Sequence, residues 1–128
     1  REILCKISKV EYYPESQMDT LCAVGGNGLA FVYYFLAALA EGGFKMGLPI
    51  ENSVRLATKT MRSAAQSLLE SGKHPAELRD NCTSPSGPAI YGLDELEKKD
   101  TASGISQAIE VAYKKITEVD ADKVQPTT

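Results

Sequence analysis

The pattern of polar and apolar positions is dominated by residues 28–40, GLAFVYYFLAALA, where no side chain is charged and only two tyrosine hydroxyls are polar. A bilayer-spanning helix needs about 20 apolar residues. This run is shorter and ends at Glu41, Gly42, Gly43 and Lys45, so it predicts a buried helix of a soluble protein rather than a membrane span. A helix that is apolar on all sides must be covered by other helices of the chain or by a partner subunit.

Short elements are expected before this helix. Residues 3–7 fit one or two helical turns, and residues 9–13 favour a short strand that Pro14 ends. Ser16 is a candidate cap for a helix that carries four apolar side chains inward. These are Met18, Leu21, Cys22 and Val24. The glycines of residues 25–28, GGNG, are expected to break that helix, with Asn27 as a candidate cap of the next one.

Glycine and proline divide the rest of the chain into further helices. Gly42 and Gly43 are expected to close or kink the apolar helix, and Gly47 with Pro49 to stop it. An amphipathic helix follows up to residues 71–72, with apolar and small residues three and four positions apart. These are Val54, Leu56, Ala57, Met61, Ala64, Ala65, Leu68 and Leu69. The fold class predicted from this pattern is all-α.

Three more helices complete the prediction. A short one begins at Pro75, because proline suits the first helical position. The next covers residues 90–98 and places Ile90, Leu93 and Leu96 on one face. The last runs from Thr101 or Ala102 to Val119. Its apolar side consists of Ile105, Ala108, Ile109, Ala112, Tyr113 and Ile116.

Composition narrows the classes of function. The 128 residues suit one domain, and the net charge of −3, with Lys and Arg spread singly, argues against a nucleic-acid or polybasic membrane-binding surface. Cys5, Cys22 and Cys82 lie far apart, so free thiols in a reduced compartment are favoured over a disulfide framework. The single histidine, His74, does not support a zinc site and is interpreted as a local cap or packing group rather than a catalyst. We assign no metal ligand.

The best candidate site is the turn at residues 81–89. Backbone amides at a helix N-terminus hold a carboxylate or phosphate without any charged side chain. Ordinary helix capping explains the same Ser, Gly and Pro residues and is the stronger interpretation on pattern alone. The GGNG segment allows either close helix packing or the approach of a ligand. Residues 94–99 indicate a solvated helix face, and the chain has no GxGxxG, Walker or GxSxG motif.

Three stretches in this order resemble one family. They are ALAEGGFKMGLP at residues 38–49, SGKHPAELRDN at residues 71–81 and TSPSGPAIYGLDELE at residues 83–97. Together they are similar to the signature segments of the C-terminal domain of pyrroline-5-carboxylate reductase, over roughly residues 10–119. The resemblance implies a helical bundle that forms an interlocked homodimer, as in the C-terminal domain of 6-phosphogluconate dehydrogenase. Residues 1–14 then correspond to the end of a Rossmann domain and its connection, and residues 15–128 to the helical dimerisation and substrate-binding domain.

The resemblance also implies an activity and a site. The family reduces 1-pyrroline-5-carboxylate to L-proline with NADPH or NADH, in proline biosynthesis, and many members assemble into decamers. The substrate carboxylate lies against a loop that corresponds here to residues 84–89. The substrate-binding residues carried over are Cys82, Ser84, Ser86, Gly87, Pro88 and Ala89. No catalytic residue is assigned, the cofactor-binding residues stay unknown, and no cofactor is expected on this fragment, which alone is expected to be inactive.

The chain departs from the family at both loops of the implied site. Residues 26–31 read GNGLAF where the family has Gly-Ser-Gly-Pro-Ala-Tyr, and residues 86–89 read SGPA where it has Gly-Gly-Thr-Thr. Ala89 replaces a threonine whose hydroxyl contacts the imine nitrogen in the family, and Pro88 lacks a backbone N–H.

Two alternatives to a working reductase therefore stay open: an impaired paralogue that keeps only the dimer, and a generic helical interaction module. We expect no nucleic-acid or membrane partner. We expect a cytoplasmic location, with the mitochondrion as the alternative.

Overall fold

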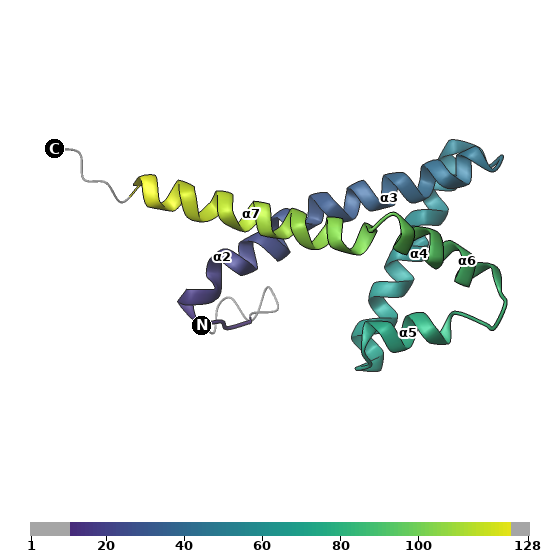
Figure 1. Ribbon diagram of the computed structural model, residues 1–128, viewed down its shortest axis with the longest axis horizontal. Helices are drawn as coiled ribbons and strands as arrows, with labels where there is room; N and C mark the ends of the chain where they lie inside the picture. The colour runs from purple at the N-terminus through teal and green to yellow at the C-terminus, as the bar shows by residue number, and fades with distance from the viewer. Residues whose placement is uncertain (1–10, 124–128) are drawn as a thin grey trace, which may run out of the picture. The chain divides into compact units, whose positions relative to one another are not determined.

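The structure is a computed structural model that describes the backbone of residues 11–123 and the side chains of residues 11–119. Every regular element in this part of the chain is helical, in agreement with the predicted all-α class (Figure 1). In chain order they are η1 (Glu15–Gln17), α2 (Met18–Leu21), η2 (Cys22–Asn27), α3 (Gly28–Lys45), α4 (Ile50–Ser71), α5 (Pro75–Asn81), α6 (Pro88–Lys98) and α7 (Thr101–Lys123). The chain divides into two compact units, residues 29–107 and the two flanking segments, which are described separately.

The N-terminal segment differs from its prediction. Residues 11–14 have no regular structure, and the expected helix at residues 3–7 lies outside the described residues, as does the start of the expected strand. Ser16 lies inside η1 rather than at its start, and neither η1 nor α2 has a side-chain cap. Met18 and Val24 are half exposed, whereas Ala23, which the periodicity did not single out, is fully buried.

The glycines at residues 25–28 do not interrupt the helix, so the predicted break is wrong. The chain stays helical through η2, a π-helical segment, and continues directly into α3. Asn27 is therefore an interior residue and not a cap. Glycine disfavours a helix by no more than about 1 kcal/mol per residue, which a local change of helical winding accommodates.

Helix α3 continues through the first of the two positions at which the sequence predicts an end or a kink and stops at the second. Gly42 and Gly43 are both helical, and α3 ends at Lys45. Gly47, with φ of 103°, then closes the helix, because the Leu48 N–H donates to Gly43 O at 3.1 Å and the Gly47 N–H donates to Phe44 O at 3.0 Å. This pair of hydrogen bonds is a Schellman motif, which requires the left-handed conformation at Gly47. The predicted stop at Gly47 and Pro49 is confirmed.

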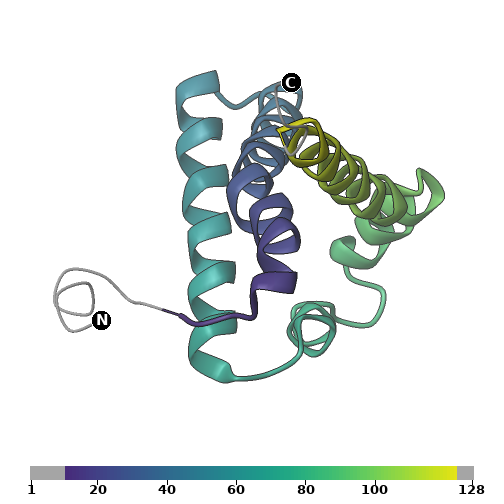
Figure 2. The same cartoon turned by 90° about the vertical axis from the view of Figure 1, so that its left-hand side faces the viewer.

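Helices α3 and α4 pack through small residues within the unit of residues 29–107 (Figure 2). Ala40 and Ala57 are buried, and the Ser53 hydroxyl, also buried, donates to Ala40 O at 2.5 Å. A Cβ atom on Gly43 would lie 2.2 Å from Ser53 Oγ. The absence of that atom is what allows the two helices to approach so closely.

The later helices begin and end near their predicted positions. Helix α4 ends before Gly72, whose φ of 63° places it in the left-handed conformation of a C-terminal glycine. Pro75 and Pro88 are the first residues of α5 and α6, and α7 begins at Thr101. Helix α7 extends beyond the predicted end at Val119 to Lys123.

The apolar surface of α3 is mostly not covered by the rest of the described chain. Tyr34 is 81% exposed, and Ala40 is the buried residue of this helix. Large apolar side chains at least one-third exposed on the same helix are Leu29, Val32, Tyr33, Phe35, Leu39 and Phe44. Residues 11–119 therefore do not supply the cover that this apolar helix needs.

The helix that contains the apolar run is longer than the sequence predicts, so its length does not exclude a membrane span. The helical stretch Glu15–Lys45 has 31 residues and a window of mean hydropathy 1.5, so length and composition alone would allow it to cross a bilayer. Only 6% of that window is buried in the single chain. Whether a partner helix or another apolar medium covers α3 thus depends on evidence other than its length.

The solvent-facing sides of the helices carry ion pairs one turn apart. Lys45 lowers the pKa of Glu41 through a hydrogen bond and its charge, and Lys114 does the same to the pKa of Glu110. All these groups are exposed, so water screens the pairs and they add little to stability.

Candidate functional site

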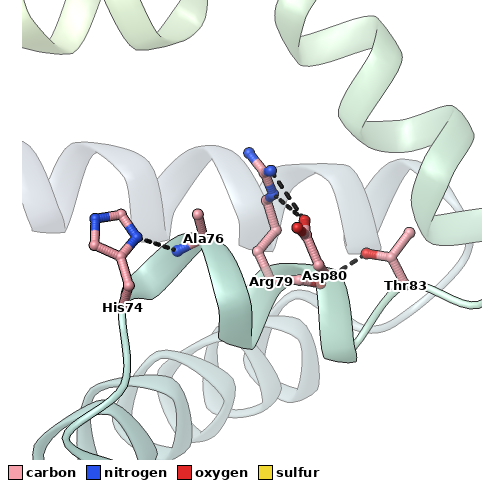
Figure 3. A network of polar contacts seen from close by, with 5 residues as sticks. All are labelled: His74, Ala76, Arg79, Asp80 and Thr83. Atoms are coloured by element: carbon pink, nitrogen blue, oxygen red, sulfur yellow. Dashed lines mark hydrogen bonds and ion pairs between the residues drawn. The ribbon is translucent and has the colours of Figure 1, made fainter.

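Helix α5 precedes the candidate loop and is held at both ends by hydrogen bonds (Figure 3). At its start, His74 Nδ1 accepts from the Ala76 N–H at 3.2 Å, and Pro75 occupies the first helical position. The predicted role of His74 as a local cap is confirmed. Lys73 and Glu77 form an ion pair of 2.6 Å across the same turn.

The far end of α5 fixes the start of the loop. The Thr83 hydroxyl donates to Arg79 O at 2.8 Å, and the Cys82 N–H donates to Leu78 O at 3.1 Å. Arg79 is turned onto its neighbour, because its Nε and Nη2 both donate to Asp80 Oδ1, at 3.0 and 2.9 Å (Figure 3). The guanidinium is therefore already paired with a carboxylate.

The loop itself is a tight turn over residues 84–87. The Gly87 N–H donates to Ser84 O at 3.0 Å, which closes a four-residue turn with Pro85 at its second position. Ser86, at the third position, has φ of 59°, a conformation that glycine or asparagine adopts more readily. A Cβ atom on Gly87 would lie 2.3 Å from Ser84 Oγ and 3.1 Å from Ser84 O. Both contacts make glycine the fitting residue at this corner.

Helix α6 begins directly after the turn. Gly87 is its N-cap residue and has an extended backbone, and Pro88 is its first residue. The Ile90 N–H donates to Gly87 O at 3.2 Å, whereas in the described part of the chain the Ala89 N–H has no hydrogen-bond acceptor. An unpaired amide at the positive end of the helix dipole attracts a carboxylate or phosphate.

The structure places the six predicted substrate-binding residues together in this one loop. Cys82 is the C-terminal cap of α5, Ser84 and Ser86 lie in the turn, and Pro88 and Ala89 open α6. All are exposed except Gly87, which is half buried. The second implied loop, residues 26–31, is helical and belongs to η2 and α3. Among residues 11–123 no group of three or more His, Cys, Asp or Glu side chains could hold a metal ion.

An open groove of about 580 Å³ lies between α5 and α6, next to the loop. Its rim carries the paired Arg79 and Asp80 together with Asp94 and Glu97, and its apolar part includes Ile90, Tyr91 and Leu93. Asp94 Oδ2 forms an ion pair with Lys98 Nζ at a distance of 2.5 Å.

Residues that shape the loop and the α3–α4 contact were not singled out by the sequence pattern. Thr83 anchors the loop to α5, but a threonine after a helix is common in any turn. Ser86 adopts a left-handed conformation that its residue type does not announce. Ser53 lies within the regular spacing of α4, yet its buried hydroxyl depends on the neighbouring helix. The pattern that would have indicated this packing of Ser53 is a small residue on α4 opposite Gly43 of α3.

Comparison with known proteins assigns this arrangement to a family. A family model described as pyrroline-5-carboxylate reductase dimerisation matches residues 15–119. A curated relative, pyrroline-5-carboxylate reductase 3 of Bos taurus, is 40% identical over 112 residues, which is 88% of this chain and 36% of that protein. The pyrroline-5-carboxylate reductase of Synechocystis is 36% identical over 119 residues, covering 93% of this chain and 45% of that protein.

A solved structure agrees. The crystal structure of a Plasmodium falciparum pyrroline carboxylate reductase with NADP bound superimposes with a TM-score of 0.82 at 32% identity, over 89% of this chain and 46% of that one. The fold is therefore that of a helical dimerisation domain. The chain belongs to the pyrroline-5-carboxylate reductase family, whose dimerisation region it contains. It spans less than half the length of these three relatives.

Proposed function

We propose that the chain is the dimerisation and substrate-binding part of an enzyme that reduces 1-pyrroline-5-carboxylate to L-proline in proline biosynthesis. The observation that carries this proposal is the family match over residues 15–119, which includes both α3 and the loop before α6. We also propose a domain division, in which residues 1–14 are the end of the cofactor domain and its connection, and residues 15–128 are the helical dimerisation and substrate-binding domain.

The loop is the proposed anchor for the substrate. The unpaired Ala89 N–H and the dipole of α6 attract the substrate carboxylate, and no charged side chain is needed in the loop. The turn closed by Ser84 and Gly87 keeps this amide accessible. The hydroxyls of Ser84 and Ser86 lie in the same exposed turn and are proposed as further donors.

The proposed partner is a second copy of the chain. The exposed apolar surface of α3 is what an interlocked dimer would cover, and such obligate interfaces bury more than about 2,000 Å². This occupant also explains α3 without a membrane, so we propose no membrane or nucleic-acid partner. Assembly of such dimers into a decamer is a further part of the proposal.

The cofactor is proposed to bind elsewhere in the full-length protein. Residues 11–123 contain no strand and no glycine-rich strand–helix turn, so this part of the chain does not fit a nicotinamide dinucleotide. NADPH or NADH supplies a hydride to the imine carbon when bound. The fragment by itself is therefore expected to be inactive. We propose that the protein acts in the cytoplasm, with the mitochondrion as the alternative.

We propose that Ala89 limits the rate of the reaction. It provides a backbone amide but no hydroxyl, so the site anchors the acid without a side-chain donor for the imine nitrogen. An impaired paralogue that keeps only the dimer is the second candidate, and the loss of a hydroxyl at this position favours it. The two candidates differ in turnover and not in assembly.

Steady-state kinetics of the full-length protein with pyrroline-5-carboxylate tests the proposal. A hydroxyl hydrogen bond present in the transition state contributes about 1–3 kcal/mol, or roughly 5- to 150-fold in rate. Ala89→Thr should therefore raise kcat more than it lowers KM. Ala89→Val is the matched control, because valine has the shape of threonine without the hydroxyl, and it should not raise kcat. Equal effects of both variants, or a fast unmodified enzyme that Ala89→Thr leaves unchanged, would contradict this assignment.

Binding of the acid is tested separately at Gly87. A side chain there meets Ser84 Oγ and Ser84 O, so Gly87→Ala should distort the turn and weaken L-proline binding. Gly92→Ala on the same helix is the control, because a Cβ atom at Gly92 meets nothing within 4 Å. Calorimetric titration of the full-length protein with L-proline measures both. Equal affinities for the two variants would show that the loop does not hold the carboxylate.

A further inference from the structure

We draw no further inference here: the strongest candidate, the open groove between α5 and α6 bounded by Arg79, Asp80, Ile90, Tyr91 and Glu97, adjoins the loop already described, and nothing in the structure shows what covers it.

Discussion

Two adjacent glycines of α3 should respond in opposite ways to the same substitution. A Cβ atom at Gly43 would lie 2.2 Å from Ser53 Oγ and 3.5 Å from Ser53 Cβ, whereas a Cβ atom at Gly42 meets nothing within 4 Å. In Gly43→Ala the Ser53 hydroxyl must rotate away from Ala40 O, or α3 and α4 must separate. Either response disturbs the only helix contact in the described chain that buries a serine side chain.

The magnitude follows from two opposing terms. Overpacking a tight contact costs about 1–3 kcal/mol. Replacing a helical glycine by alanine returns up to about 1 kcal/mol. Gly43→Ala should therefore lower the free energy of unfolding by up to about 2 kcal/mol, and Gly42→Ala should raise it by up to about 1 kcal/mol.

Urea unfolding at one fixed protein concentration measures both variants, because the stability of a dimer depends on concentration. The double variant Gly43→Ala with Ser53→Ala removes the clashing hydroxyl and should recover part of the loss. Equal destabilisation at Gly42 and Gly43, or no recovery in the double variant, would refute the packing described for α3 and α4.

Substitutions at three further positions test the cap of α5, the turn before α6 and the dimer interface. His74→Ala removes the acceptor for the Ala76 N–H and should lower the free energy of unfolding by about 1 kcal/mol. His74→Asn keeps a capping side chain and should lower it less. Equal losses in the two variants would contradict the capping role of His74. Ser86→Gly should raise the free energy of unfolding by up to about 1 kcal/mol, because glycine adopts a φ of 59° without strain. A lower free energy of unfolding in this variant would contradict the described turn. Tyr34→Ser should weaken dimerisation and Tyr34→Phe should not; equal dissociation constants in sedimentation would remove Tyr34 from the interface.

Local signals in the sequence predict most helix boundaries. Proline marks the first residue of α5 as predicted, whereas α6 begins at Pro88, two residues before its predicted start. Left-handed glycine follows the ends of α3 and α4 at Gly47 and Gly72. These residues act through backbone geometry that depends on a few neighbours only. Boundaries of this kind are therefore readable without knowledge of the tertiary structure.

At the glycines of residues 25–28, local signals do not predict the structure. Their low helix propensity predicts a break, yet the chain passes from η2 into α3 without one. Propensity contributes at most about 1 kcal/mol per glycine, so the surrounding helix decides the outcome. The π-helical winding of η2 is not signalled by any residue type.

Apolarity predicts that α3 needs cover but does not identify it. Residues 28–40 demand burial on all sides, and the chain leaves Tyr34 81% exposed. The described residues do not supply this cover, and the hydrophobic pattern by itself does not say what does.

The sequence predicts the structure of the candidate loop but not its function. The Ser, Gly and Pro residues before α6 indicate a turn and a helix start, and the structure confirms both. The proposal that they anchor a carboxylate rests on the family resemblance and not on the pattern, because capping and anion binding use the same residues. The conformation of Ser86 depends on the closure of the turn and not on its own preference.

Sedimentation equilibrium at low micromolar concentration tests whether a second copy of this chain covers α3. We expect one folded species of twice the chain mass of 13.8 kDa, with no monomer populated at these concentrations. A stable, folded monomer of 13.8 kDa would show that no second copy covers α3, because its apolar side chains would then remain exposed to water.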